Sequence, residues 1–229
     1  MSSAAPRSES ASDILIVAAH QPELFGFQDL LGPALSATLS GLRVMARPVG
    51  IGMPAAAVGV SAAIVEHRPR LVVAVGTCGS YEGRGPAIGR VVVAAGVHLA
   101  SIAAIEGRGG LPNVMQAALV ADPAVASALV AVEGVVMADV ATTLAITTDD
   151  ALADAIATSH GCQVEHLEAY SMALACRAQR IPFACVLGVA NRVGRRGREQ
   201  WIEHHLAAGE AAVAVVARWL QASEPAVKI

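Results

Sequence analysis

Continuous apolar runs alternate along the chain with segments that have helical spacing. The runs at 14–19 (ILIVAA), 71–75 (LVVAV) and 90–97 (RVVVAAGV) contain almost no polar residues, which is typical of strands buried on both faces of a sheet. A further strand is expected over 42–49, and one or two over 135–147. Strands that alternate with helices predict an α/β protein with a largely parallel or mixed central sheet, and the pattern leaves the strand order open.

Capping residues mark the helices between these strands. A helix with Pro54 in its first turn is expected to end before Pro69, because proline suits a first turn and disfavours helix at the residue before it. Asp122 is a candidate N-cap for the next helix, and residues 148–150 cap a helix that stops at Gly161.

The composition indicates one folded domain. Of 229 residues, 55% are hydrophobic and 15% are charged, which argues against disorder. A chain of this length can bury a hydrophobic core that needs no disulfides or metal ions to stabilise it. The polar segment 1–12 is predicted to be a disordered tail. Residues 13–229 are predicted to form one domain, because no linker rich in Gly, Ser or Pro divides them.

Charge and targeting signals narrow the partners. The formal net charge of −3 gives no electrostatic reason to expect binding to nucleic acid or to an anionic membrane. The amino-terminal segment lacks the apolar core of a secretory signal, and no apolar run is long enough to cross a bilayer. Cys78, Cys162, Cys176 and Cys185 have neither metal spacing nor a CxxC pair. We therefore expect a cytoplasmic protein with reduced cysteines.

The familiar cofactor motifs are incomplete. Gly50-Ile51-Gly52 lacks the third glycine of a dinucleotide fingerprint, and neither a P-loop nor a GxSxG elbow is present. Glu203-His204-His205 is not HExxH, and neighbouring helical residues point about 100° apart, which makes joint chelation difficult. We expect neither a metal nor an organic cofactor.

Polar side chains follow several of the apolar strands. The stretch 164–201 predicts a short strand ending near Glu168, a helix, a buried strand running into Asn191, and then a final helix to about 220. Glu23 follows the first strand, and a loop is expected at Gly76–Ser80. Ligands of α/β proteins usually bind at such strand ends. The alternatives are a surface role for each carboxylate and a plain turn at the glycines.

The densest positive charge follows Asn191, at Arg192, Arg195, Arg196 and Arg198. These residues form either a solvated loop or a clamp for an anionic group, because guanidinium groups match carboxylates and phosphates.

At these residues the chain resembles the nucleoside phosphorylase and nucleosidase superfamily. The matching segments are 50–57 (GIGMPAAA), 71–80 (LVVAVGTCGS), 88–93 (IGRVVV), 164–173 (VEHLEAYSMA) and 181–193 (IPFACVLGVANRV). The resemblance implies a single α/β domain with a twisted mixed sheet flanked by helices. It also implies cleavage of the bond between a ribose and a purine, and a homo-oligomer.

The resemblance assigns roles to single residues. Glu168 falls at the ribose-binding glutamate of the family, preceded here by Leu167 where the family has Met. Asn191 falls where adenine-cleaving members have an Asp that protonates the purine. Because an amide cannot act as a general acid, Asn191 resembles members that act on 6-oxopurines. Thr77, Cys78 and Gly79 (through their backbone) and Thr147 would line the base pocket.

The resemblance also favours hydrolysis. Glu23 aligns with the glutamate that activates water in nucleosidases, and Ala74 replaces the phosphate-binding Arg of bacterial phosphorylases. The sequence at Asn191, Arg192 and Trp201 is most similar to futalosine hydrolases, whose substrate has a carboxylated tail that an Arg of the 192–198 loop would bind. The alternatives are a purine nucleoside phosphorylase, a methylthioadenosine/S-adenosylhomocysteine nucleosidase, and a nucleoside-binding protein without catalysis.

Overall fold

The fold is a computed structural model that describes residues 11–222. In this range the strands are β1 Ile14–Ala18, β2 Ser36–Leu39, β3 Leu42–Pro48, β4 Leu71–Ser80, β5 Val91–Leu99, β6 Ala118–Val120, β7 Val135–Thr142, β8 Val164–His166 and β9 Phe183–Arg192. The helices are the 3-10 helix η1 Gln21–Phe27 and α1 Gln28–Leu31, α2 Met53–His67, α3 Ile102–Ile105, α4 Pro123–Val130, α5 Asp150–His160, α6 Ala169–Ala178 and α7 Gly197–Gln221.

All the strands join one mixed sheet, which confirms the predicted fold class. The order is β2-β3-β1-β4-β8-β7-β5-β6, and β9 pairs with both β4 and β5. Strands β4, β9, β5, β7 and β8 therefore pair in a closed ring. β1 runs parallel to β3 and β4, whereas β8 is antiparallel to β4. Closing the ring gives each of its five strands two partners, so within residues 11–222 only β2 and β6 remain as edge strands of the sheet.

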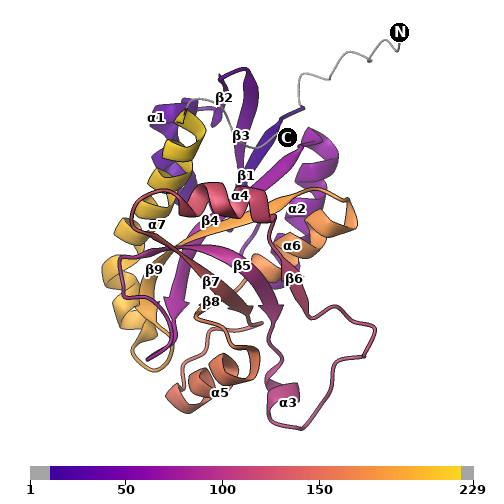
Figure 1. Cartoon of the computed structure of the whole chain (residues 1–229), viewed down its shortest axis with the longest axis vertical. Coiled ribbons are helices and arrows are strands. Elements are labelled where there is room, and N and C mark those ends of the chain that lie inside the picture. Colours follow the sequence, from indigo (N-terminus) through magenta and orange to yellow (C-terminus); the bar gives the residue numbers. More distant parts are fainter. Residues whose placement is uncertain (1–10, 223–229) are drawn as a thin grey trace.

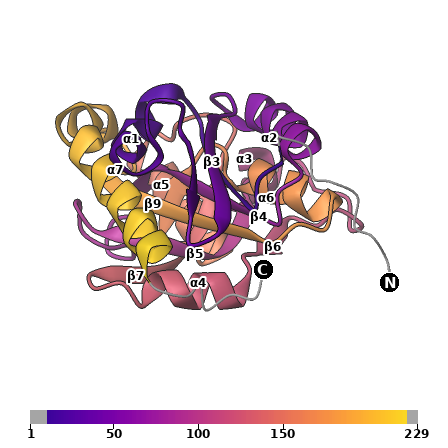
Figure 2. The ribbon, with the colours of Figure 1, turned by 90° about the horizontal axis from the view of Figure 1, so that it is seen from above.

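Helices cover both sides of the sheet (Figures 1 and 2). Viewed from above in Figure 2, α7 and α1 lie on the left, and α2 and α6 lie together on the right. One apolar core lies between the sheet and α2 and α6, and a second lies between the sheet and η1, α4 and α7. A third cluster, below the sheet in Figure 1, packs α5 against the ends of β4 and β7.

Several of the predicted boundaries are confirmed. α2 begins at Met53 and ends at His67, and α7 covers the predicted final helix. The side chain of Asp122 caps α4, and α5 ends at Gly161 in the left-handed conformation with φ +66°. Capping residues in the local sequence therefore mark where these helices begin and end.

One prediction near the strands is wrong, and one strand was missed. The predicted loop at Gly76–Ser80 is the second half of β4, which continues to Ser80 beside β9 and β8. The strand predicted at 42–49 is confirmed as β3, and the preceding strand β2, which pairs with it as a hairpin, was not predicted. Residues 135–147 contain one strand, β7, which ends at Thr142.

The predicted tail falls mostly outside the described residues, which begin at residue 11. Ala11 and Ser12 are buried, and the Ser12 N–H donates to His67 O at 2.7 Å. Between residues 11 and 222, no helix has the length and apolarity needed to cross a bilayer.

Candidate functional site

Glu23 lies in the first turn of η1, directly after β1. Its Oε2 accepts the His20 N–H at 3.2 Å and lies 3.1 Å from His20 Nδ1. Its Oε1 points toward β4: a Cβ atom built on Gly76 would lie 3.2 Å from it. The chain thus holds one oxygen of Glu23 and leaves the other facing the middle of β4.

Glu168 follows β8 and precedes α6, and its side chain is 5% exposed. Oε1 accepts the Gly52 N–H at 2.7 Å, and Oε2 lies 3.3 Å from His166 Nε2. Gly52 is the N-cap of α2 with φ +84°, so Glu168 lies at the positive end of a 15-residue helix, where an anion is stabilised. Two separate segments therefore hold one carboxylate.

His166, the last residue of β8, is a site residue that the sequence analysis missed. Its Nδ1 accepts the backbone N–H groups of Glu168 (3.2 Å) and Ala169 (3.1 Å). A Cβ on Gly76 would lie 3.3 Å from its Nε2. Glu23 and His166 therefore meet beside Gly76, where the missing side chain leaves room, and Glu168 lies next to His166.

Asn191, near the end of β9, lies opposite Gly79 of β4. Its Nδ2 donates to Arg192 O at 2.8 Å, and a Cβ on Gly79 would lie 3.0 Å from Nδ2. Its side-chain oxygen has no hydrogen bond to the described part of the chain. An amide in this state can still accept a hydrogen bond from a ligand.

Thr77 and Cys78 turn their side chains away from a ligand. Thr77 Oγ1 accepts from Trp201 Nε1 of α7 at 3.2 Å, and Trp201 in turn stacks on His205 with ring centroids 4.0 Å apart. Cys78 lies in the core beneath α2 and α6, and burial raises the pKa of its thiol. Both side chains therefore have contacts within the protein, and the backbone role that the resemblance implied stays a prediction.

Thr147 is bound to a buried carboxylate. Its N–H donates to Glu165 Oε1 at 3.1 Å and its hydroxyl to Oε2 at 2.7 Å, and the Tyr81 hydroxyl donates to Oε2 at 3.0 Å. Burial raises the pKa of Glu165, and the hydrogen bonds from Thr147 and Tyr81 partly oppose this shift. Thr147 O accepts the Gly194 N–H at 3.2 Å, so the Glu165 network fixes the loop that follows Asn191.

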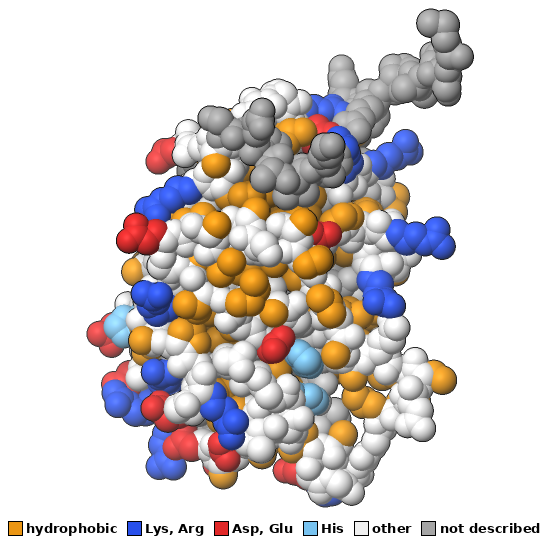
Figure 3. Space-filling model, in the orientation of Figure 1, with side chains coloured by type: hydrophobic (Ala, Val, Ile, Leu, Met, Phe, Trp, Pro, Cys, Tyr) orange, Lys and Arg blue, Asp and Glu red, His pale blue; other side chains and the backbone are white. Residues whose placement is uncertain are grey.

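Three of the four arginines after Asn191 have partners within the described part of the chain. Arg192 Nη1 donates to Ser80 Oγ at 2.8 Å and to Pro86 O at 3.2 Å. Arg195 pairs with Asp150 at 2.8 Å and Arg196 with Glu199 at 3.7 Å. Figure 3 shows basic and acidic side chains intermixed at the lower left of the molecule, where α7 begins. A pocket of about 640 Å³ between α5 and this loop is lined by Arg192, Arg195 and Arg196.

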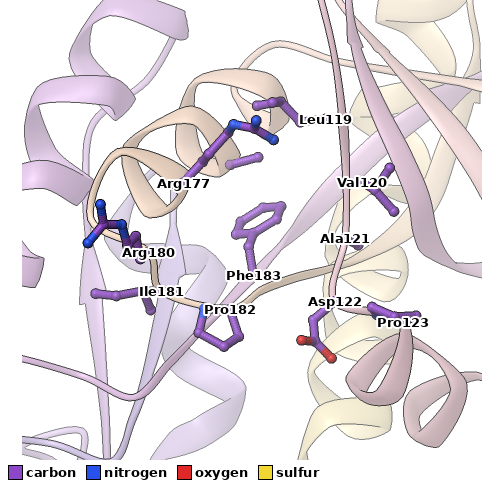
Figure 4. A pocket seen from close by; sticks show the side chains of 11 residues that line it. Leu119, Val120, Ala121, Asp122, Pro123, Arg177, Arg180, Ile181, Pro182 and Phe183 are labelled. Atoms are coloured by element: carbon purple, nitrogen blue, oxygen red, sulfur yellow. The ribbon is translucent and has the colours of Figure 1, made fainter. Parts of the chain in front are cut away.

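A second pocket of about 600 Å³ lies at the opposite end of β9, around Phe183 (Figure 4). It is roughly 26 Å from Asn191 along the strand. Arg177 extends toward Leu119, and Arg180 points away from Phe183. The carboxylate of Asp122 caps α4 at 3.0–3.1 Å. This pocket offers no free carboxylate or imidazole for acid–base chemistry. Among residues 11–222, no three His, Cys, Asp or Glu side chains form a metal site.

The sequence model of the phosphorylase superfamily matches residues 26–223. The chain belongs to this superfamily. Its similarity to solved structures agrees: the 5'-methylthioadenosine/S-adenosylhomocysteine nucleosidase of Neisseria meningitidis, in complex with methylthio-immucillin-A, superposes with a TM-score of 0.80 at 18% identity. The alignment covers 91% of this chain and 98% of that chain. No curated protein matches the chain.

Two Helicobacter pylori structures are similar to this phosphorylase-superfamily chain. A mutant of the 5'-methylthioadenosine/S-adenosylhomocysteine nucleosidase, with 5'-methylthioadenosine in the active site, has a TM-score of 0.82 at 12% identity, covering 91% of this chain and 97% of that chain. A futalosine hydrolase mutant has a TM-score of 0.78 at 13% identity, covering 90% and 97%. At these identities the likeness establishes a shared fold, and fold alone does not select a substrate.

In this phosphorylase-superfamily fold, the predicted site residues fall into two groups. Glu23 faces Gly76 and Glu168 lies next to His166, which also faces Gly76, whereas Asn191 lies farther along β4 at Gly79. Leu167, between His166 and Glu168, is partly exposed. The side chains of Thr77, Cys78, Thr147 and Arg192 instead have contacts within the protein. The predicted polar residues therefore lie at two places along β4, Glu23 and Glu168 toward Gly76 and Asn191 at Gly79.

Proposed function

We propose that this chain hydrolyses the N-glycosidic bond of a 6-oxopurine nucleoside. The observation that carries the proposal is that two carboxylates lie around one imidazole: a Cβ atom on Gly76 would lie 3.2 Å from Glu23 Oε1 and 3.3 Å from His166 Nε2, and Glu168 Oε2 lies 3.3 Å from that nitrogen. Cleavage through an oxocarbenium-like state needs a carboxylate near the sugar and a second one to activate water. Glu168 takes the first role and Glu23 the second.

Each carboxylate suits its role. Glu168, at the N-terminus of α2 and 5% exposed, stays close to the sugar hydroxyls and responds to the positive charge that develops on the ring. Glu23 has a side chain that is 15% exposed, so solvent can supply the attacking water. Glu23 Oε1, which has no hydrogen bond to the described residues, accepts the proton of that water.

Hydrolysis is preferred to phosphorolysis because the site lacks a cradle for phosphate. The described contacts of Glu23, His166 and Glu168 involve histidine and backbone N–H groups and no Arg or Lys. Ala74, two residues before Gly76, is buried in the core beneath α2. A phosphate dianion so close to two carboxylates would need cationic partners.

Asn191 favours a 6-oxopurine base. Its free amide oxygen accepts a hydrogen bond from a base N–H, and its amide cannot protonate adenine as a carboxylic acid would. Futalosine is the substrate we favour, because a pocket of about 640 Å³ lined by Arg192, Arg195 and Arg196 lies beside the loop that follows Asn191. A carboxylated tail there would replace Asp150 or Glu82 as partner of these arginines.

We also propose that the chain forms a homo-oligomer. Ile51, Val58 and Val65, at and along α2, are 65%, 72% and 68% exposed. Val58 and Val65 are two helical turns apart and share one face. An apolar stripe of this kind is typical of a surface that a second subunit covers.

The test is a panel of nucleosides incubated with and without phosphate, with the free base measured by chromatography. We expect hypoxanthine from futalosine or inosine at equal rates in both buffers. Glu23→Gln should reduce turnover by about 10²- to 10⁴-fold, the usual contribution of a general base. Release that requires phosphate would select a phosphorylase. Adenine release alone would select a methylthioadenosine/S-adenosylhomocysteine nucleosidase. Tight binding without cleavage would select a nucleoside-binding protein.

A further inference from the structure

His166 is the one polar side chain beside Gly76 to which the sequence analysis gave no role. We propose that His166 is a positioning residue that holds Glu168 for the sugar hydroxyls. The inference rests on the proposed function and deepens it. The imidazole is 6% exposed, so its partners are protein groups rather than bulk water.

The hydrogen bonds of the ring determine which nitrogen has the proton. Nδ1 faces two donors, the N–H groups of Glu168 at 3.2 Å and Ala169 at 3.1 Å. An imidazole nitrogen that accepts hydrogen bonds has no proton, so the proton of the neutral ring lies on Nε2. Nε2 is 3.3 Å from Glu168 Oε2. The start of α6 thus directs a donor at Glu168.

This donor is next to Glu168 and also borders the space that Glu23 faces. The space where a Gly76 side chain would lie is 3.3 Å from His166 Nε2 and 3.2 Å from Glu23 Oε1. Oε1 of Glu168 is already fixed by Gly52 at 2.7 Å, so the His166 contact fixes its second oxygen. A carboxylate held at both oxygens keeps one orientation when a sugar binds, and preorganisation of this kind favours catalysis.

A simpler role for His166 is to cap α6, since its Nδ1 accepts from the first N–H groups of the helix. Two substitutions separate the roles. His166→Asn retains an acceptor near the Nδ1 position and loses the donor at the end of the ring. His166→Gln retains a donor near the Nε2 position and loses the cap. Thermal melting of both variants reports the cap, and kinetics report the donor.

The experiment compares inosine with 2',3'-dideoxyinosine as substrates of wild-type protein and both variants. Because Glu168 acts on the sugar hydroxyls, H166N should lower kcat/KM for inosine by about 10- to 100-fold and change that for 2',3'-dideoxyinosine less than about threefold. H166Q should recover most of the preference for inosine despite a lower melting temperature. Equal losses on both substrates, or an unchanged ratio in H166N, would overturn the inference.

Calorimetric titration of the same two nucleosides separates this inference from the proposed function. If the wild-type protein binds inosine without cleaving it, hydrolysis is disproved. The ratio that then tests His166 is the dissociation constant of the nucleoside that lacks the sugar hydroxyls divided by that of inosine. If that ratio falls in H166N, the positioning role stands; if it is unchanged, the role is wrong. A wild-type protein that binds neither nucleoside contradicts both.

Discussion

Gly76→Ala is the most direct test of where the chemistry takes place. The added Cβ would lie 3.2 Å from Glu23 Oε1, 3.3 Å from His166 Nε2 and 3.7 Å from Leu187 Cδ2. The first two distances are shorter than ordinary van der Waals contact, so Glu23 and His166 must move by a few tenths of an ångström. The methyl group also fills the space in which both carboxylates would meet a sugar or water.

The size of the effect follows from these contacts. Overpacking of a well-packed site costs about 1–3 kcal/mol, whereas replacing a strand glycine by alanine returns about 0.5–1 kcal/mol through chain entropy. Misplacement of reacting groups by about 1 Å costs about 100-fold in rate. A displacement of a few tenths of an ångström, together with the space that the methyl group fills, therefore predicts a decrease in kcat/KM of about tenfold or more. A tenfold decrease corresponds to about 1.4 kcal/mol of activation free energy.

The matched control is Gly209→Ala in α7. A Cβ there meets only Thr77 Cγ2, at 3.8 Å, which is ordinary contact. Both variants should be folded by circular dichroism, with G76A less stable than G209A by about 1–3 kcal/mol in urea. Release of hypoxanthine should remain near the wild-type rate in G209A and fall in G76A. A G76A protein with wild-type kcat/KM would show that the space between Glu23 and His166 is not used in the reaction.

Three further experiments, two with substitutions and one on the wild-type protein, test other parts of the interpretation. Asn191→Asp should move the ratio of adenine to hypoxanthine release toward adenine by about tenfold or more; an unchanged ratio in a base-release assay would remove Asn191 from base selection. Burial raises the pKa of Glu165 above its ordinary value of 4.5, so this group stabilises the fold most below that value and loses the contribution as pH rises through its raised pKa. The melting temperature of Glu165→Gln relative to wild type should therefore increase from pH 4.5 toward neutrality, and a constant difference would contradict the assignment. Light scattering should give a multiple of 23.3 kDa, because Ile51, Val58 and Val65 are exposed; a monomer mass would contradict the oligomer.

The sequence predicted the elements that local chemistry determines. The run at 14–19 has no polar residue and forms β1, which is buried along its whole length. Asp149 accepts the Leu152 N–H at 2.8 Å, so the cap of α5 was visible as an acidic residue before a helical pattern. In both cases a few neighbouring residues contain the signal.

The hairpin of β2 and β3 was missed although a local signal exists. Ser40 and Gly41 connect the strands with φ +48° and +80°, as the tight turns of hairpins require. The Ser-Gly pair could have indicated this turn. The strand before it, Ser36–Leu39, has four residues and alternating exposure, which is a weak pattern on its own.

The half of β4 beyond Gly76 could not be predicted, because tertiary pairing overrides local preference there. Glycine disfavours strands, yet Thr77 pairs with Gly188 and Gly79 pairs with Glu165 and Asn191. His166 was missed for a similar reason. A single histidine between two glutamates is not distinctive, and its importance comes from Gly52 and Glu23, which lie far away in the sequence.

The irregular pairing of β4 with β9 explains how the proposed base end of the site is formed. The register shifts between Cys78 and Gly79, so Cys78 lies opposite Val189 and Gly79 opposite Asn191. Without the shift, Ala190 would lie opposite Gly79, and a one-residue slip turns each side chain to the other face. Gly79 also lacks the Cβ that would approach Asn191 Nδ2 to 3.0 Å. The same strand thus makes room for the carboxylates at Gly76 and for the amide at Gly79, at a cost of about 0.5–1 kcal/mol for each glycine. A regular, alanine-rich β4 would make a more stable sheet and, by this reasoning, would leave no room for either end of the nucleoside.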